Sequence, residues 1–396
     1  MVSRIKILVA SRSEVAANAV TAKLRMHGRF NVNTRVVVNG HTDPLHDVHP
    51  RPDVLVLHYV PGYGELEYLA MLNPNQRARL LVFGPAGDAG AMRLAMRAGA
   101  SDYLPEPLTE TDLLHSLDRL CEELSQKAGN SGKLLTVVNS KGGSGASFVA
   151  TNLACVLAKD ESRRTTLMDL DLQFGGLARY LDLAPERGVV EALDAISEMD
   201  QAAAEAFVTV HGSGLKLLAA PSDRLIQQVH VSPEQVDMLL QVFLQNNDYV
   251  VADLPRQIDG LSTTVLERSD RILLIVQQSL AHINGAAKLL HVITGELGMS
   301  RDLVEVVVNR FEKKSVIELD DVRKTLRVDH VHVISNQYKL VSESIDTGNP
   351  AIQSAKGSAV SKALRELTTK VCGSDGDGTR RTGFLGRTLP NLLGAN

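Results

Sequence analysis

The stretch Leu134-Leu-Thr-Val-Val-Asn-Ser-Lys-Gly-Gly-Ser-Gly-Ala-Ser147 decides the fold of the larger part of the chain. Its apolar half predicts a buried strand, and a helical pattern runs from Ser147 to Ala158. Between them, Gly142, Gly143 and Gly145 allow successive backbone N–H groups to face one side, which makes an anion-binding nest at a helix N-terminus. The stretch therefore predicts a phosphate-binding loop. A plain Gly-rich turn between a strand and a helix is the alternative.

The loop departs from an ordinary phosphate loop at one position. Ser147 stands where a hydroxyl group binds Mg²⁺, but Ala146 occupies the place of the lysine that reaches the β- and γ-phosphates. Loss of such a positive charge lowers the rate of phosphoryl transfer by orders of magnitude. The expected activity is ATP binding with slow or vestigial hydrolysis, a weak ATPase at most.

Two later strands end in acidic residues. Asp169 and Asp171 lie at the end of one predicted strand, where they can approach a γ-phosphate and its water. The segment 247–253 is an apolar strand that ends in Asp253, which is suited to hold a Mg²⁺-bound water. Each acid alone is more often part of a solvated turn. Their order and spacing after the Gly-rich loop favour a magnesium-nucleotide site.

Short apolar runs alternate with helical patterns along the whole chain, which predicts two doubly wound parallel-sheet α/β domains. Strands of the first domain are expected at 5–10, 36–38, 53–58, 79–83 and 101–104. Those of the second are expected at 134–139, 165–169, 216–219, 249–253, 271–277, 303–308 and 330–334. The predicted boundaries are residues 1–124 for the first domain, 125–132 for a polar linker, 133–372 for the second domain and 373–396 for a flexible tail.

Composition restricts the class of protein. The 396 residues suffice for two or three domains, and 44% apolar residues can give each domain a core. A net charge of −4 gives no support to binding nucleic acid over the whole surface. Three cysteines without metal spacing, no signal-like N-terminus and no apolar run of about 18 residues favour a cytoplasmic protein.

The segment Lys141–Ser147 resembles the deviant Walker A loop of the ParA/MinD superfamily, KGGxGK[ST]. Three further stretches look like the superfamily's switch I, its Walker B strand and its adenine-contact strand: 166–175, 249–255 and 306–310. The loop before the superfamily's last helix is similar to 333–350. The resemblance covers about residues 132–372 and implies a deviant-Walker P-loop NTPase fold that binds ATP and Mg²⁺ as a homodimer.

The resemblance also implies roles for single residues. Lys141 would be the signature lysine that crosses the dimer interface to the partner's phosphates, for which a solvent-exposed loop lysine is the alternative. Asp171 would orient the attacking water, and Asn309 would contact adenine. The metal would be held, partly through water, by Ser147, Asp169 and Asp253. The nucleotide phosphates would be cradled by Lys141, Gly142, Gly143, Ser144, Gly145, Ala146 and Ser147.

The N-terminal domain resembles a response-regulator receiver of the flavodoxin-type fold, notably at 99–107, but without its chemistry. The receiver's acidic cluster, phosphoacceptor aspartate, hydroxyl residue and lysine correspond here to Ala10-Ser11-Arg12, His58, Gly84 and Glu106. Phosphorylation would have no mechanism in such a site, so a degenerate interaction or dimerisation module is expected. This domain, fused to a ParA/MinD-like domain with alanine at 146, resembles the TadZ/CpaE family of tight-adherence (Flp) pilus assembly proteins.

That family resemblance implies a spatial regulator that recruits pilus assembly and secretion ATPases and polar localisation proteins. Two other functions stay open: an active ParA/MinD-type ATPase in DNA partition or division-site placement, and a nucleotide-free scaffold. The tail segment 380–393 mixes arginines with Phe384 and leucines, so peripheral contact with the inner membrane is a further interpretation. A disordered end or a partner-binding peptide is favoured, because Pro390 interrupts a helix.

Overall fold

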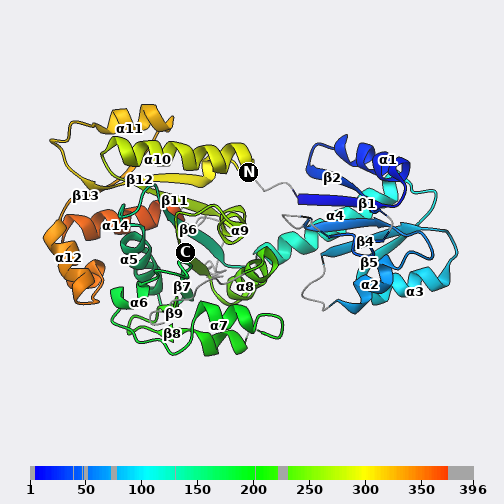
Figure 1. The fold of residues 1–396 in the computed structure, drawn as a ribbon, viewed down its shortest axis with the longest axis horizontal. Coiled ribbons are helices and arrows are strands. Elements are labelled where there is room, and N and C mark those ends of the chain that lie inside the picture. Colours follow the sequence, from blue (N-terminus) through cyan, green and yellow to red (C-terminus); the bar gives the residue numbers. More distant parts are fainter. Residues whose placement is uncertain are drawn as a thin grey trace, which may run out of the picture.

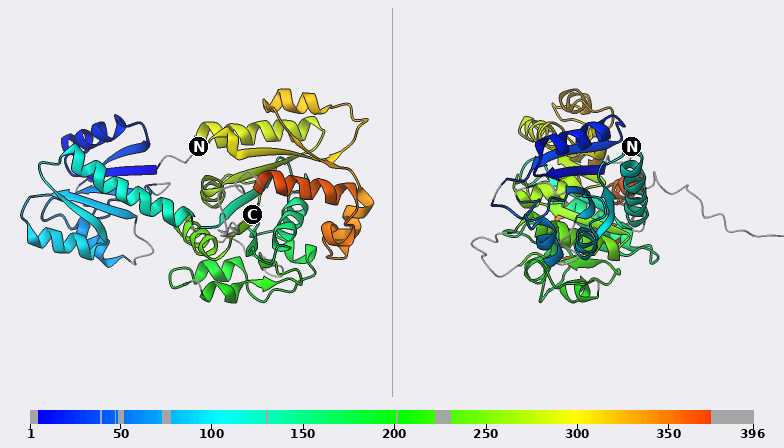
Figure 2. Two further views of the ribbon diagram at one scale, coloured as in Figure 1. Left: turned by 180° about the vertical axis from the view of Figure 1, so that it is seen from behind. Right: turned by 90° about the vertical axis from the view of Figure 1, so that its right-hand side faces the viewer.

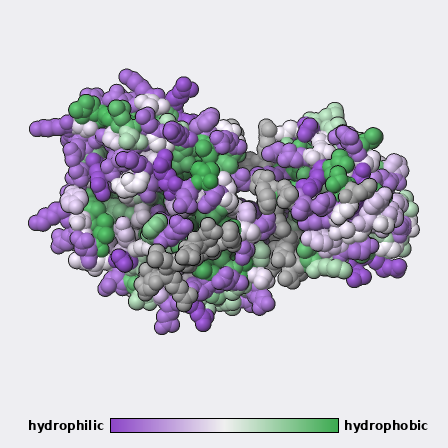
Figure 3. Space-filling view, viewed as in Figure 1, coloured by the Kyte–Doolittle hydropathy of each residue, from purple (hydrophilic) through white to green (hydrophobic). Residues whose placement is uncertain are grey.

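The computed structural model describes residues 5–38, 40–46, 48, 52–72, 78–129, 131–200, 202–221 and 231–372. It contains two separate sheets, a five-stranded one at the N-terminal end and an eight-stranded one beyond it. The long helix α4 (Glu110–Gly129) connects the two bodies, which stand side by side in Figures 1 and 2. The space-filling view shows a mainly hydrophilic face with separate apolar patches (Figure 3).

The N-terminal sheet is entirely parallel, with strand order β2-β1-β3-β4-β5. Its strands are β1 (Ile5–Ser11), β2 (Phe30–Val36), β3 (Val54–His58), β4 (Arg79–Gly84) and β5 (Ala100–Pro105). Besides α4, its helices are α1 (Glu14–Arg25), α2 (Glu65–Met71) and α3 (Ala89–Arg97). Apolar residues of α1 and α4 share one core with one sheet face, and those of α2 and α3 share another core with the opposite face.

The C-terminal sheet has the order β13-β12-β11-β6-β10-β7-β9-β8. Its strands are β6 (Lys133–Asn139), β7 (Thr165–Asp169), β8 (Thr209–Val210), β9 (Lys216–Leu218), β10 (Tyr249–Leu254), β11 (Arg271–Val276), β12 (Val304–Phe311) and β13 (His332–Ser335). Strand β6 lies inside the sheet, and residues 134–138 are buried along their whole length. This explains the continuous apolar run in the sequence, because helices cover both faces of such a sheet.

Two helical layers cover this sheet. The layer that packs on the core under the Gly-rich loop consists of α5 (Ala146–Ala158), α6 (Leu177–Tyr180), α12 (Tyr338–Asp346), α13 (Ala351–Ser354) and α14 (Ala359–Cys372). The opposite layer consists of α7 (Val189–Asp194), α8 (Pro233–Asn246), α9 (Gly260–Arg268), α10 (Leu280–His291) and α11 (Leu319–Leu326). The predicted fold class, two doubly wound α/β domains, is confirmed.

Several predicted elements differ from the structure. The strand predicted at 36–38 is wrong: β2 spans Phe30–Val36. Phe30 and Val32 are buried and alternate with the exposed Asn31 and Asn33, as on an edge strand. Helix α2 and strand β8 are absent from the prediction, and β8 pairs antiparallel with β9. Helix α4 continues to Gly129, so residues 125–129 of the predicted linker are helical.

The two bodies meet at the amino ends of their strands. Helix α4 ends just before β6 begins, and Lys6 near the start of β1 forms an ion pair with Glu267 at the end of α9, with 3.6 Å between Nζ and Oε2. The strands paired with β6 run parallel to it, so the Gly-rich loop lies at the opposite edge of the sheet. The N-terminal body therefore leaves that carboxyl edge uncovered (Figure 1). The predicted domain boundaries themselves stay a prediction, and the predicted tail 373–396 lies outside the described residues.

Candidate functional site

The Gly-rich loop joins β6 to α5 in a conformation that only glycine adopts easily. Gly143 and Gly145 have φ angles of +81° and +100°, and Gly145 is the N-cap of α5. Ser144 is buried and closes the loop on itself, because its hydroxyl donates to the Lys141 carbonyl at 2.6 Å. The loop is thus a tight, internally bonded turn at the start of a buried helix.

The loop presents unused backbone donors. Within the part of the chain that the structure describes, the N–H groups of Gly142, Gly143, Gly145 and Ser147 donate no hydrogen bond. Four such donors within six residues at a helix N-terminus, with the N–H groups of Ser144 and Ala146 between them bonded inside the protein, match the anion nest that the glycine spacing predicts. An anion of the size and charge of a phosphate group would satisfy these donors.

Three side-chain amides from neighbouring strands hold this loop from behind. Asn139 is the last residue of β6, and its side-chain oxygen accepts the Ala146 N–H at 3.0 Å. Gln277 follows β11 and donates to the Gly143 carbonyl at 3.0 Å, and Asn309 on β12 donates to the Ser144 carbonyl at 2.8 Å. The loop carbonyls are therefore tied back toward the sheet. Sequence reasoning missed Asn139 and Gln277, although each is a polar residue directly at the end of a buried strand.

We expect Gly145→Ala to lower the free energy of unfolding by about 2–4 kcal/mol. A Cβ atom at this position would lie 2.3 Å from the amide nitrogen of Asn309, at a φ angle that alanine avoids. Gly142→Ala is the matched control, because a Cβ atom there meets nothing within 4 Å. Urea denaturation of both variants checks the prediction, and equal midpoints would contradict the proposed packing of Asn309 on the loop.

A buried acidic pair lies beside the loop. Asp253 on β10 and Asp169 at the end of β7 are register partners on neighbouring parallel strands, and both are almost fully buried. Burial raises the pKa of Asp253 to about 7, and the charge of Asp169 adds to the rise, while a hydrogen bond from Ser147 opposes it. Burial likewise raises the pKa of Asp169 to about 6. The structure thus brings Ser147, Asp169 and Asp253 together, as the sequence predicts for a metal site.

These residues fit a magnesium ion. Two buried carboxylates with raised pKa values gain from a divalent cation, and hydroxyl and carboxylate oxygens are ligands that Mg²⁺ prefers. No group of three or more His, Cys, Asp or Glu residues among the described residues could hold a metal ion alone. A Mg²⁺ ion here would therefore depend on Ser147, water and phosphate oxygens as well as on the acids.

Asp169 and Asp171 also organise the segment after β7. The Asp169 carboxylate accepts the N–H groups of Leu177 at 3.0 Å and Asp171 at 3.3 Å, which ties both ends of this segment together. The Asp171 carboxylate accepts the Phe174 N–H at 3.0 Å. Both acids thus hold a short loop beside the site, and their roles toward metal and water stay predictions.

Lys141 and Asn309 differ in their freedom to reach a ligand. Lys141 is exposed at the tip of the loop, and its side chain has no partner within the described chain. Asn309 is almost fully buried, and both ends of its amide are used: Nδ2 donates to Ser144 and Oδ1 accepts the Arg310 N–H at 2.9 Å. In this structure Asn309 acts as a support for the loop, and its contact with adenine stays a prediction.

At the carboxyl edge of the N-terminal sheet, polar side chains bond to one another within the domain. Ser11 at the end of β1 bonds through its hydroxyl to Nδ1 of His58 at 2.8 Å, and Nε2 of His58 lies 3.1 Å from a Glu106 carboxylate oxygen. Gly84 ends β4, and a Cβ atom there would lie 2.9 Å from the Tyr103 hydroxyl. This edge is therefore occupied by the Ser11–His58–Glu106 chain and by Tyr103.

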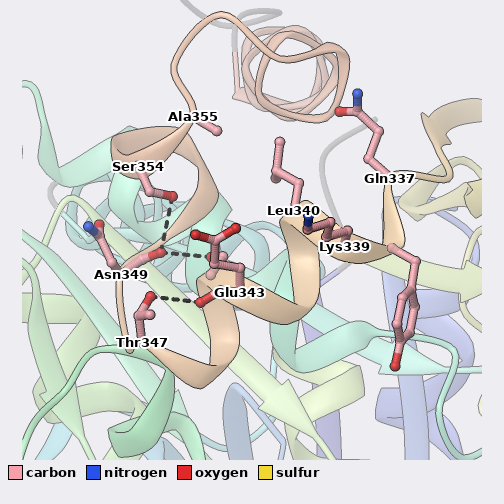
Figure 4. Close-up of a pocket in the computed structure, with 10 residues that line it drawn as sticks. Gln337, Lys339, Leu340, Glu343, Thr347, Asn349, Ser354 and Ala355 are labelled. Carbon is pink, nitrogen blue, oxygen red and sulfur yellow. Dashed lines mark hydrogen bonds between the residues drawn. The ribbon is translucent and has the colours of Figure 1, made fainter.

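A cavity of about 760 Å³ opens on the C-terminal body beside α12 (Figure 4). It is lined by residues of α12 such as Lys339 and Glu343, and by Asn349 and Ser354 beyond it. None of the predicted site residues lines it.

No helix among the described residues is long and apolar enough to cross a membrane.

The C-terminal body is similar to known proteins. Residues 132–297 match the family model described as an AAA domain. The chain is 24% identical over 247 residues to the septum site-determining protein MinD of Thermotoga maritima, covering 61% of this chain and 89% of that protein. It is 28% identical over 172 residues to the antiactivator FleN of Pseudomonas aeruginosa, covering 43% of this chain and 59% of that protein.

Solved structures agree on the fold. The crystal structure of a ParA family ATPase from Chlorobium tepidum has a TM-score of 0.55 at 24% identity and covers 60% of this chain and 98% of that one. MinD of Pyrococcus horikoshii, solved in complex with Mg-ADP, has a TM-score of 0.52 at 17% identity and covers 61% and 96%. These two likenesses concern the fold alone.

Proposed function

We propose that this chain, whose C-terminal domain is a relative of the ParA/MinD superfamily, is an ATP-binding spatial regulator that dimerises on ATP and recruits a pilus assembly machine. The single observation that carries the nucleotide site is the set of four unused N–H groups in the loop that ends at Ser147, whose side chain bonds to Asp253. When bound, Mg²⁺ would neutralise phosphate charge at Ser147, Asp253 and Asp169. The chain's own loop would bind and orient the triphosphate.

The homodimer is supported by apolar side chains at the carboxyl edge of the C-terminal sheet. The segments that follow five of the strands each expose one large apolar residue, in a loop or at the first position of the next helix, with between 52% and 98% of its surface accessible. These residues are Phe174 after β7, Ile258 after β10, Leu280 after β11, Val316 after β12 and Tyr338 after β13. The strands are parallel, so all five lie around the edge that carries the Gly-rich loop. A second copy of this edge is the occupant that would bury them and bring a second Lys141.

The pilus role rests on two features of the sequence and geometry. Alanine at 146 matches the loop variant of the TadZ/CpaE family, and the N-terminal edge holds Ser11, His58 and Glu106 in place of phosphorylation chemistry. In this proposal the N-terminal domain binds polar localisation or pilus assembly proteins constitutively, while the C-terminal domain supplies the nucleotide switch. The proposed location is cytoplasmic, at a pole and peripheral to the inner membrane.

Two other functions are separated from this one by experiment. Similarity to MinD and ParA is equally consistent with an active ATPase in division-site placement or DNA partition, and salt-sensitive retention of DNA by the ATP-bound protein would favour partition. A nucleotide-free scaffold would not bind ATP at all.

The deciding measurement is the mass of the wild-type protein by light scattering with ATP–Mg²⁺, with ADP–Mg²⁺ and without nucleotide. A doubled mass with ATP alone supports the proposal, and an unchanged mass overturns it.

We expect Ala146→Lys to raise the rate of ATP hydrolysis by about tenfold or more, because it restores a cation at the phosphates. Wild type should turn over slowly by comparison. Ala146→Met is the matched control, since methionine has a length similar to that of lysine but no charge. Position 146 is buried, so the larger side chain should destabilise both variants by a similar amount. Steady-state phosphate release measures the effect. Wild-type turnover as fast as that of a partition ATPase would contradict the idea of vestigial hydrolysis.

A further inference from the structure

Arg310 stands at an irregular point of β12. Its φ angle is +53°, a left-handed conformation that costs arginine about 1 kcal/mol or more. The pairing of β12 with β13 shifts register between Val308 and Phe311, which is the mark of a β-bulge. Bulges re-aim side chains and are frequent beside functional sites. The strand is thus distorted immediately after Asn309, the residue that contacts the phosphate loop.

The backbone of Arg310 is connected to the loop through the side chain of Asn309. Its backbone N–H donates to the Asn309 carboxamide, whose other end donates to Ser144. Its side chain is exposed and, among the described residues, forms no ion pair or hydrogen bond. The residue that carries this guanidinium group therefore follows directly after Asn309, the residue that holds the loop of the anion nest.

The electrostatic neighbours of Arg310 lie on both sides of the loop. Burial raises the pKa of Tyr180, Asp253 and Asp169 raise it further, and the positive charge of Arg310 lowers it. Burial lowers the pKa of His282, and the charges of Lys141 and Arg310 lower it further. The charge of Arg310 therefore reaches Tyr180, which also lies in the field of the acidic pair, and His282, which also lies in the field of the loop lysine. A cation between these two groups is near the carboxylates and the loop that would bind the phosphates.

We propose that Arg310 is a phosphate-binding residue of this site and supplies, from the same chain, the positive charge that the loop lacks at Ala146. The inference rests on the proposed function, because it concerns the triphosphate bound by the loop. Arginine suits the task, since its planar guanidinium group donates up to five hydrogen bonds and pairs with phosphate oxygens in two-pronged geometry. Unlike Lys141, it acts within one subunit, so the charge is present before a dimer forms.

The test measures the affinity for ATP–Mg²⁺ by titration calorimetry in the Lys141→Ala background, where the proposed dimer contact is absent. Arg310→Gly should weaken binding at least tenfold, while Arg310→Lys, which keeps the charge but loses the two-pronged geometry, should weaken it less than Arg310→Gly does. Glycine also relieves the left-handed strain, so the melting temperature of Arg310→Gly should not fall. Loss of affinity together with loss of stability would overturn the proposal.

Arg327→Gly is the matched control. Arg327 is exposed and has a φ angle of +52°, but it caps the end of α11, and the neighbouring Leu326 carbonyl bonds to Arg301, which lies before the start of β12. It should bind ATP as the parent protein does. Equal affinity of Arg310→Gly and its parent overturns the inference alone. Absence of ATP binding in the wild type overturns both the inference and the proposed function.

A rescue experiment tests the replacement of charge directly. Ala146→Lys, introduced beside Arg310→Gly, should recover most of the lost affinity, because either cation neutralises the same phosphates. Arg256 is the competing candidate: its guanidinium nitrogen would lie 3.7 Å from a Cβ atom at Gly285, next to the Ser140 carbonyl. A tenfold loss in Arg256→Ala with no loss in Arg310→Gly would assign the cation to Arg256 and overturn the proposal.

Discussion

Lys141→Ala should leave the protein monomeric in the presence of ATP–Mg²⁺, whereas the wild type doubles its mass. The Lys141 side chain is exposed at the tip of the loop and has no partner within the described chain, so its charge is available to a second subunit. The loop carries no other lysine, since position 146 is alanine. Two triphosphates facing each other without this cation would repel, and ATP would oppose the dimer.

The measurement is sedimentation velocity of wild type and variant, each with and without ATP–Mg²⁺. Lys159→Ala is the matched control, because Lys159 is an exposed lysine at the opposite end of α5. It should dimerise as wild type does. Both substitutions are at exposed positions and should change the free energy of unfolding by no more than about 0.5 kcal/mol. Equal mass in all samples would remove the central step of the proposed function.

Asp253→Asn should stabilise the nucleotide-free protein at pH 8 and abolish its stabilisation by Mg²⁺. The pKa of Asp253 rises from 3.8 when unfolded to about 7 in the fold, so at pH 8 folding forces a buried carboxylate to stay ionised. A difference of this size corresponds to a penalty of about 4 kcal/mol on the native state. Asparagine keeps the shape of the side chain and carries no charge.

The sign of the pH dependence follows from proton counts. Between about pH 4 and pH 7 the folded state binds more protons at Asp253 than the unfolded state, so stability falls as pH rises through this range. Asp169, with a raised pKa of about 6, acts in the same direction. Without Mg²⁺, the melting temperature of the wild type should therefore fall between pH 5 and pH 8. The fall should be larger than the one measured for Asp253→Asn over the same range.

Thermal melts at pH 5 and pH 8, each with and without about 10 mM Mg²⁺, measure how the melting temperature depends on pH and on the metal ion. Asp160→Asn is the control, because hydrogen bonds from Ser162 lower the pKa of Asp160, so that this carboxylate is ionised at both pH values and its replacement should not change the difference between the two melts. A wild-type melting temperature at pH 8 that is insensitive to Mg²⁺ and equal to that of Asp253→Asn would refute a buried acidic metal site.

The sequence allowed the fold class and the location of the site to be predicted because both depend on local signals. Buried parallel strands appear as continuous apolar runs, as in 134–138, and the glycines at 142, 143 and 145 follow one of them directly. Strand β2 shows where this reasoning fails. An edge strand buries only alternate side chains, so the stronger apolar run at 36–38 was a misleading signal for its position.

The residues that support the loop could not be predicted in the same way. Gln277 and Asn309 come more than 130 residues after Asn139 in the sequence, but the three residues lie on or directly after three neighbouring strands, β6, β11 and β12. No local pattern distinguishes a strand-end amide that bonds to a loop from one that faces water. The same holds for Arg310, whose left-handed backbone depends on the irregular pairing of β12 with β13.

The sequence by itself determined that this protein is built from two doubly wound α/β units. It also determined that a Gly-rich loop with alanine at position 146 follows the first strand of the larger unit. Only the tertiary structure decided which side chains hold that loop, how deeply Asp253 and Asp169 are buried beside it, and which free cation stands nearby. The physical reason is that periodicity and glycine conformation are properties of short segments. Burial, raised pKa values and the meeting of charges depend on distances between segments far apart in the chain.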